Sequence, residues 1–236
     1  MKIPAAQYYR TQEMVRRFRD KPRSGFFRSE TALLDTISVE SLRSVLDVGC
    51  AAGRFLGLLR DYGFTGSYTG IDVVAENLSN AWQSHPDATF LEGDVLQMPL
   101  PEKFDLVNAT GILQNEPRYT ALLDRMLATS SRYVMFDVKV ADIEQTLVDP
   151  DVAYCEWEGC RLPVVCLSSA DFRTMLQSLA EAGRVRFLSY PTPFNSETVV
   201  PSWLARWSSV GVLVDLKDPA LDGEAVIDLS AKGVAL

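Results

Sequence analysis

The chain has 236 residues, 47% of them hydrophobic and 23% charged, and a net charge of -8 at pH 7. This length and composition suit one globular α/β domain with a sizeable core, and they exclude a disordered or fibrous protein. The negative charge disfavours nucleic acid as the main partner, because proteins that bind it show a basic surface. No apolar run reaches the roughly 18 residues of a membrane helix, and the first residues lack the apolar core of a signal peptide. We therefore expect a cytoplasmic protein with no membrane partner.

The first 28 residues are strongly basic, with eight Lys or Arg against two Asp or Glu. Bulky residues recur at near-helical spacing over residues 8–18, which predicts an amphipathic helix. A second helix is predicted over residues 29–37 with Ser29 as its cap. We assign residues 1–43 to an amino-terminal helical cap or lid. The basic helix would suit an anionic substrate, and a solvated basic helix face is the alternative.

From residue 44 onward, short β-rich runs alternate with helical runs. Seven strands are predicted, over residues 44–48, 67–71, 89–91, 104–108, 132–138, 184–190 and 210–216. The intervening helices are predicted over residues 54–62, 75–84, 119–128 and 169–180. This alternation is typical of βαβ units, so the expected fold class is α/β, with a doubly wound, mostly parallel seven-stranded sheet and helices on both faces. We assign this domain to residues 44–217.

The alternation pauses after the fifth predicted strand, in an insertion over residues 141–167. Insertions of this length are usually lids or binding loops. Residues 153–166 are predicted as a hairpin, with its turn near Glu158 and Gly159. The tail, residues 218–236, is acidic and weakly patterned, so no element is predicted there.

Four cysteines stand at widely different spacings, namely Cys50, Cys155, Cys160 and Cys166. These spacings match neither the closely spaced pairs of a zinc site nor a disulfide framework. Free cysteine commonly behaves as a small buried hydrophobe, so we expect structural thiols and no metal. The last three fall within a dozen residues, which leaves a thiophilic site as an alternative.

The turn after the first predicted strand reads VLDVGCAAGRF over residues 45–55. Its glycines let the backbone turn sharply and let a ligand approach without a Cβ in the way. Two acids follow at fitting distances. Asp72 ends the second strand, where a carboxylate can accept hydrogen bonds from ribose hydroxyls, and Asp94 follows the third strand, where it can meet an adenine amine. The sequence therefore predicts a ligand site at the carboxyl edge of the sheet.

This combination resembles the class I S-adenosylmethionine-dependent methyltransferases, in which a strand ends in Asp-x-Gly-x-Gly-x-Gly and an acid follows each of the next two strands. Asp47, Gly49 and Gly53 match the pattern, and Ala51 stands at the middle glycine. The fourth strand, FDLVNATGILQ over residues 104–114, is also similar, with Gln114 where small-molecule members often have histidine. The resemblance covers residues 44–140 and implies a Rossmann-like sheet.

By this resemblance the cofactor is S-adenosyl-L-methionine (SAM). The turn would border its methionine end, Asp72 its ribose and Asp94 its adenine, while the end of the fourth strand would form the floor beneath the sulfonium. The residues expected to bind it are Asp47, Gly49, Cys50, Ala51, Gly53, Asp72, Val73, Asp94, Val95, Asn108 and Ala109. Two alternatives stay open, since Asp47 could instead orient the turn and Asp94 could instead cap one.

The resemblance implies a SAM-dependent methyltransferase that acts on an oxygen, nitrogen or other nucleophile of a small soluble metabolite, an anionic one where the basic helix takes part. A nicotinamide dehydrogenase fails on the motif, because Gly-x-Gly-x-x-Gly would need glycines where Ala51 and Arg54 stand. A nucleic-acid methyltransferase stays an alternative, although residues 108–111 lack the aromatic side chain that stacks on a flipped base. A SAM-binding regulatory protein without catalysis is the other alternative.

Methyl transfer from a sulfonium mainly needs the nucleophile and the methyl group to be aligned. The one histidine, His85, is predicted at the amino-terminal edge of the sheet, away from the ligand edge. The candidates for positioning the acceptor are therefore Tyr8, Tyr9, Asn108 and Gln114. For a hydroxyl acceptor, Asp137 and Glu156 are further candidate bases. The sequence leaves the acceptor and the oligomeric state open.

Overall fold

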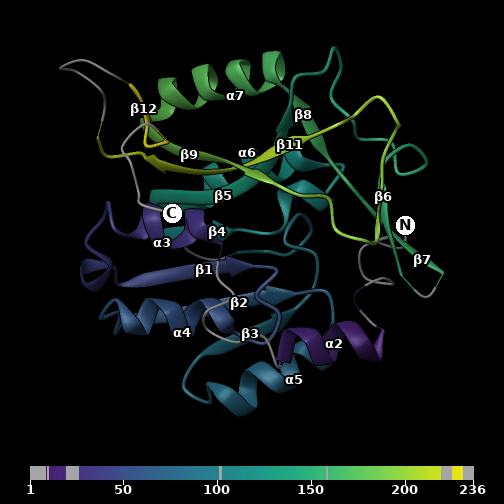
Figure 1. Cartoon of the computed structure of the whole chain (residues 1–236). Helices are drawn as coiled ribbons and strands as arrows, with labels where there is room; N and C mark the ends of the chain where they lie inside the picture. The colour runs from purple at the N-terminus through teal and green to yellow at the C-terminus, as the bar shows by residue number, and fades with distance from the viewer. Residues whose placement is uncertain are drawn as a thin grey trace.

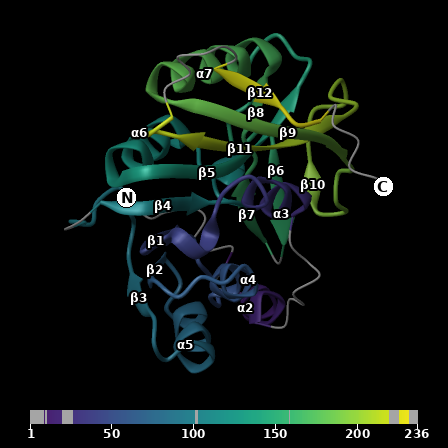
Figure 2. The same cartoon turned by 90° about the vertical axis from the view of Figure 1, so that its left-hand side faces the viewer.

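The computed structural model describes residues 9, 11–19, 27–100, 103–157, 159–218 and 225–230. One large sheet runs through the middle of the molecule, and helices lie on both of its sides (Figure 1; Figure 2). Within the described ranges, no helix has the length and apolarity that crossing a membrane requires. Tyr8 and most of the predicted tail lie outside these ranges.

The large sheet contains nine strands in the order β12-β9-β11-β5-β4-β1-β2-β3, with β8 paired to β5. Their bounds are β1 Ser44–Val48, β2 Ser67–Asp72, β3 Thr89–Glu92, β4 Phe104–Ala109, β5 Ser130–Ala141, β8 Cys166–Ser168, β9 Arg184–Thr192, β11 Trp207–Asp215 and β12 Val226–Asp228. Strand β11 runs antiparallel to its neighbours β5 and β9, and the other pairs are parallel. The predicted doubly wound, mostly parallel sheet is therefore confirmed.

The predicted count of seven strands is wrong, because two short strands extend the sheet. Strand β8 pairs with the last residues of β5, which runs on to Ala141, and β12 pairs with β9 at the sheet edge. Both supply hydrogen-bond partners to backbone groups that the neighbouring strand would otherwise leave unpaired. Strands of three residues are too short to show a periodic pattern, so the sequence gives no signal for them.

Among the described residues, five helices cover the two faces of the sheet. Both faces carry apolar side chains to pack against, because consecutive side chains of a strand point to opposite faces. They are α3 Arg28–Leu34, α4 Arg54–Asp61, α5 Ala75–Ser84, α6 Tyr119–Thr129 and α7 Ser169–Ala182, with the short 3-10 helices η2 Val39–Ser41 and η3 Leu113–Asn115 between them. One core joins the sheet to α3, α4 and α5 through Leu33, Leu56 and Leu78. Another joins it to α6 and α7 through Met126 and Leu176. The prediction of helices on both faces is confirmed.

A helix and a second sheet, together called the cap here, lie beside the carboxyl ends of the parallel strands (Figure 2). The cap consists of α2 Gln12–Arg19 and the strands β6 Tyr154–Trp157, β7 Cys160–Pro163 and β10 Thr198–Val199. Strand β6 pairs antiparallel with both β7 and β10, which confirms the predicted hairpin in the insertion. A third core, which includes Met14 of α2, Leu162 of β7 and Trp207 of β11, joins the cap to the large sheet.

Helix α3 begins differently from the prediction. Its N-cap is Phe27, whose backbone N–H donates to Oε2 of Glu30 at 2.6 Å. Ser29, the predicted cap, lies inside the helix instead and is fully buried. It packs closely on β11, since a Cβ at Gly211 would lie 2.2 Å from Ser29 Cβ. The helix start is therefore set by packing on the sheet and by the Glu30 bond, not by the serine.

Candidate active site

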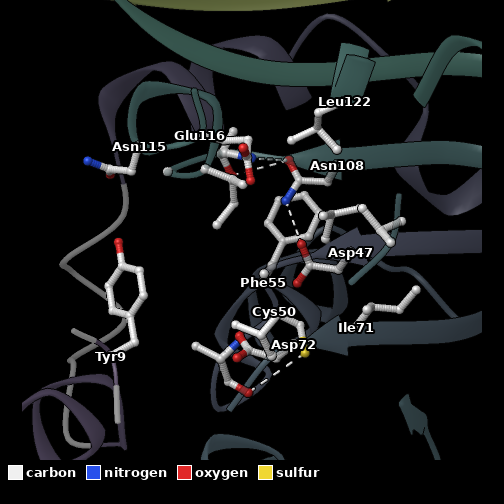
Figure 3. A pocket seen from close by; sticks show the side chains of 18 of the residues that line it. Tyr9, Asp47, Cys50, Phe55, Ile71, Asp72, Asn108, Asn115, Glu116 and Leu122 are labelled. Carbon is white, nitrogen blue, oxygen red and sulfur yellow. Dashed lines mark hydrogen bonds between the residues drawn. The ribbon is translucent and has the colours of Figure 1, made fainter. Parts of the chain in front are cut away.

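A cavity of about 280 Å³ opens at the turns after the parallel strands, and Tyr9, Phe27 and Glu30 border it from the amino-terminal part of the chain. Figure 3 shows Asp47 and Asp72 on one side of it and Tyr9 on the other, with the tyrosine hydroxyl directed toward Asn115. The turns after β1, β2, β3 and β4 are called the strand-end wall below, and Tyr9, Gln114 and Asn115 the opposite wall. The cavity lies at the edge of the sheet where open α/β proteins bind ligands.

The turn after β1 is held against β2. The backbone N–H groups of Gly49 and Cys50 both donate to the Ile71 carbonyl, at 2.7 and 3.1 Å. Gly49 has a φ of 72°, which favours glycine, and a Cβ there would lie 2.1 Å from Ile112 Cδ1, so the Ile112 side chain would have to move. Ala51 also has a positive φ, 47°, a conformation that is strained for a residue with a Cβ. The backbone therefore keeps a glycine-like conformation where the alanine replaces glycine.

Asp72 stabilises two turns at once. Its Oδ2 accepts from Ala51 N and its Oδ1 from Val74 N, both at 2.9 Å. Burial raises the pKa of the Asp72 carboxyl, and these backbone N–H groups partly oppose the shift. Asn77 is buried beside the same part of the cavity, and its Oδ1 accepts from no group in the described ranges. Carboxylate and amide oxygens thus border the cavity where hydroxyl groups of a ligand were predicted.

Asp94 caps a turn and also binds an arginine. Its Oδ1 accepts from Leu96 N and its Oδ2 from the Arg118 guanidinium, both at 3.0 Å. Arg118 makes a two-point contact with the Glu116 carboxylate at 2.9 Å, and these bonds raise the pKa of Arg118. Asp94 therefore caps a turn. A contact of Asp94 and Val95 with adenine stays a prediction.

Asp47 belongs to a chain of buried hydrogen bonds below the cavity. Its Oδ1 accepts from Asn108 Nδ2 at 2.7 Å, and its Oδ2 accepts from the Tyr68 hydroxyl. Burial raises the pKa of Asp47 to about 7, although both bonds oppose this shift. Asn108 Oδ1 accepts in turn from Thr110 N at 3.3 Å, and it lies 3.1 Å from the Thr110 hydroxyl oxygen, whose single hydrogen points either to Asn108 or to Glu30. These bonds run from Asp47 to side chains of β2 and β4. They fix the shape of the cavity at residues 108–111, which are called the floor below.

Asp137 holds Gly111 of the floor from the side away from the cavity. Its Oδ1 accepts from Gly111 N at 2.6 Å, and Gly111 has a φ of 83°. The side chain is 1% exposed, and burial raises the pKa of Asp137 to about 6. Glu156, the other candidate base, lies 3.9 Å from Arg161 on the surface of the hairpin. Neither of these acids is among the residues that border the cavity.

Glu30 of α3 borders the cavity and was missed in the sequence, although it is only 1% exposed. Besides the Phe27 N–H, its carboxylate accepts from the Thr110 hydroxyl at 3.0 Å and lies 3.5 Å from the Arg54 guanidinium. It thereby joins α3 to the end of β4 and the start of α4. A glutamate three residues after a helix cap is a known signal, but the predicted cap at Ser29 placed it in the wrong helical position.

Most of the residues predicted to bind the cofactor border the cavity, namely Asp47, Gly49, Cys50, Ala51, Asp72, Val73, Asp94, Val95 and Asn108. Gly53 and Ala109 are not among them, because Gly53 is the N-cap of α4 and Ala109 is fully buried in the core. Tyr9 and Gln114, two of the candidates for positioning an acceptor, also border it. Gln114 Oε1 is buried and accepts from no group in the part of the chain that the structure describes.

His85 and the three clustered cysteines lie away from the cavity. His85 is the C-cap of α5, and its Nδ1 lies 3.1 Å from the Arg60 guanidinium. Cys155, Cys160 and Cys166 are free thiols in or against the core of the cap, and burial raises the pKa of Cys166 to about 12. Among the described residues, no three His, Cys, Asp or Glu side chains are grouped as a metal site requires. The thiophilic alternative therefore has no support in these residues.

The fold and the acids at its strand ends define an α/β protein with a nucleotide-type ligand site. Residues 46–146 match the family model described as a methyltransferase domain. A trans-aconitate 2-methyltransferase from Escherichia coli O1:K1 / APEC is 27% identical over 115 residues, which are 49% of this chain and 46% of that protein. The match thus spans about half the length of such relatives.

Solved structures share the fold over most of the chain. Magnesium protoporphyrin IX methyltransferase from Synechocystis PCC 6803 with bound SAM aligns with a TM-score of 0.54 at 14% identity, covering 89% of this chain and 95% of that one. The N-terminal domain of EvdMO1 with bound S-adenosylhomocysteine (SAH) aligns with a TM-score of 0.58 at 17% identity, covering 86% and 96%. The match of residues 46–146 to a methyltransferase domain thus agrees with the family resemblance predicted from the sequence, and the solved structures show that the fold is shared over most of the chain.

Proposed function

We propose that the protein is a SAM-dependent methyltransferase that acts on an oxygen, nitrogen or other nucleophile of a small soluble metabolite. The observation that supports this most is the cavity, which gathers an acid from the end of each of β1, β2 and β3 above the floor formed after β4. The residues fit SAM. Gly49 has no Cβ, so a ligand can approach the backbone of the turn closely. The Asp72 carboxylate and Asn77 Oδ1, which has no partner among the described residues, can accept hydrogen bonds from ribose hydroxyls.

In this proposal each wall has its own task. When bound, SAM supplies an activated methyl group. Asp72 and Asn77 bind the ribose, Asp94 and Val95 the adenine, and the turn after β1 the methionine end. The opposite wall positions the acceptor, through Tyr9 and Gln114. Catalysis then depends mainly on holding the nucleophile in line with the methyl group. Asn108 is already bonded to Asp47 and Thr110, so its part is to hold the floor.

The names of related proteins support a small acceptor, since they specify trans-aconitate and magnesium protoporphyrin IX. An anionic acceptor would depend on the basic segment over residues 1–28. The described cavity itself is bordered by five carboxylates and two guanidinium groups, those of Glu30, Asp47, Asp72, Asp94, Glu116, Arg54 and Arg118. Of these groups, the proposal assigns Asp72 and Asp94 to the cofactor, and Glu116 is paired with Arg118.

The cofactor is tested by titrating SAM and SAH into the purified protein in a calorimeter. We expect micromolar binding by the wild type, and a loss of at least about tenfold in Asp72→Ala because ribose hydroxyls lose a charged acceptor. Asp124→Ala is the matched control, since Asp124 is exposed on α6 and does not border the cavity. A folded wild type that binds neither compound would overturn the proposal.

The acceptor is tested by measuring SAH release against panels of small amines, alcohols and carboxylic acids, with DNA and RNA oligonucleotides as a separate panel. Turnover on a small molecule supports the proposal. Turnover confined to the oligonucleotides would instead favour a nucleic-acid methyltransferase. Tight binding of SAM without turnover on any panel would favour a regulatory protein.

A further inference from the structure

The two ends of the cavity differ in chemistry. At the β2 and β3 end, Asp72 and Asn77 suit hydroxyl groups, and the charges of Asp94 and Glu116 are already paired with Arg118. At the other end, where α3 and α4 begin, three charged side chains border the cavity: the carboxylates of Glu30 and Asp47 and the guanidinium of Arg54. The question is what ligand feature these three charges match.

The three groups are held by one another and by the floor. Glu30 Oε1 lies 3.5 Å from Arg54 and accepts from the Thr110 hydroxyl at 3.0 Å. The Thr110 N–H donates to Asn108 Oδ1 at 3.3 Å, and Asn108 Nδ2 donates to Asp47 at 2.7 Å. The two carboxylates are therefore fixed on either side of the floor. Glu30 is 1% exposed and Asp47 is 2% exposed, so water screens their charges weakly.

The charges at this end are opposite to those of the methionine end of SAM. That end carries a sulfonium, an ammonium and a carboxylate, two positive charges and one negative. The protein presents the Glu30 carboxylate, the Arg54 guanidinium and the Asp47 carboxyl, whose pKa burial raises to about 7, so that a cationic ligand beside it favours its negative form. SAH has a neutral thioether in place of the sulfonium, so it matches only one of the two carboxylates.

We propose that Glu30 and Asp47 form a carboxylate pair that recognises the positive charge of SAM and makes the site prefer SAM to SAH. This inference rests on the proposed function. Glu30, which lies in α3 before the turn after β1, is thereby a residue that determines specificity.

The pair also affects product release. In methyl transfer the carbon–sulfur bond breaks, its electron pair stays on sulfur, and the methyl carbon bonds to the nucleophile of the acceptor, whose proton passes to a base or to water. Sulfur thereby loses the positive charge that attracts the Glu30 carboxylate and the negative form of Asp47. The product is bound less well than the substrate form of the cofactor, which favours exchange of SAH for SAM.

The test is the ratio of the dissociation constants for SAH and SAM in Glu30→Gln. Glutamine keeps two of the bonds of Glu30, because its amide oxygen can accept from Phe27 N and its NH2 group can donate to the Thr110 hydroxyl, which then donates to Asn108; only the contact of Oε1 with Arg54 is lost. We expect the preference for SAM to fall about tenfold in this variant, as close charge pairs contribute in double-mutant cycles. Sinefungin, which carries an amine in place of the methylated sulfur, should follow SAM and separate the effect of charge from that of the methyl group.

Asp72→Asn is the matched control, since it removes a carboxylate that would face the ribose common to SAM and SAH. It should weaken both and leave their ratio unchanged. Asp47→Asn is an independent second variant with the same expected direction as Glu30→Gln, and circular dichroism melts establish which variants are folded. An unchanged ratio in a folded variant of either acid would overturn the inference alone. Failure of the wild type to bind both compounds would overturn the proposed function and the inference with it.

Discussion

The strand-end wall and the opposite wall of the cavity are built differently. On the strand-end wall, the acids already have partners in the protein: Asp72 accepts two backbone N–H groups, and Asp47 accepts two side-chain donors. On the opposite wall, Gln114 Oε1 is buried and has no partner among the described residues. The comparison shows acids that hydrogen bonds hold in place facing an amide oxygen that keeps its hydrogen-bonding capacity. The first suits a cofactor common to a family, and the second suits an acceptor that differs from member to member.

The rigidity of the strand-end wall predicts the largest effect, for Gly49→Ala. The new Cβ would sit 2.1 Å from Ile112 Cδ1 in a backbone with a φ of 72°. Steric overlap and backbone strain together should lower the free energy of unfolding by about 3 kcal/mol. Urea denaturation measures this, and calorimetry should show weaker binding of SAM.

Gly159→Ala is the matched control for this prediction. Its φ is 75°, but nothing lies within 4 Å of the added Cβ, so only the backbone strain applies. We expect a loss of about 1 kcal/mol. Equal losses in the two variants would mean that the contact with Ile112 does not restrict the turn.

The second prediction concerns how the free energy of unfolding depends on pH through Asp137, the buried acid that holds Gly111 of the floor. Because burial raises the pKa of Asp137 to about 6, the folded state holds its proton more tightly than the unfolded chain does. The resulting stability is fully present below the unfolded pKa, near 4, and is lost as the pH rises through 6. Asp137→Asn keeps an oxygen for Gly111 N and cannot ionise. It should therefore reduce the fall in unfolding free energy between pH 4 and pH 7.5 by on the order of 2 kcal/mol.

Urea unfolding at a series of pH values measures this difference. Asp124→Asn, on the exposed side of α6, should leave the profile of the wild type unchanged. A profile for Asp137→Asn that runs parallel to that of the wild type would show that the Asp137 carboxyl does not titrate differently on folding.

The two walls also differ in how far the sequence predicts them. The strand-end wall could be predicted, because its residues follow strands with a clear pattern and match a known motif, as Asp72 and Gly49 do. Glu30 was missed because its position depends on where α3 begins, which is set by the packing of Ser29 on Gly211, a contact between residues far apart in the chain. The hairpin of the cap was predicted from its turn, but β8 and β12 were not, since three residues show no period.

The third prediction concerns the unpaired amide of the opposite wall. Gln114→Met keeps the length of the side chain and removes the buried oxygen without a partner, so the free energy of unfolding should rise by about 1 kcal/mol. The value of kcat/KM for the acceptor should fall at the same time, because the acceptor loses a polar contact. Gln83→Met, on the exposed side of α5, should change neither quantity appreciably. A variant that is both more stable and fully active would exclude Gln114 from acceptor binding.

The smallest expected effect, at Ala51, tests whether the strand-end wall has been optimised for stability. Ala51 adopts a φ of 47°, so glycine would relieve strain in the folded state while gaining entropy in the unfolded chain. These contributions nearly cancel, and Ala51→Gly should stabilise the protein by no more than about 0.5 kcal/mol. Ala52→Gly gains the same entropy at a residue without a positive φ, and it should destabilise the protein by roughly 0.5 to 1 kcal/mol. Urea denaturation of the two variants separates strain from entropy. Equal destabilisation of both would mean that Ala51 is unstrained, and that an alanine at the middle position of the turn is as well accommodated as the glycine of the family pattern.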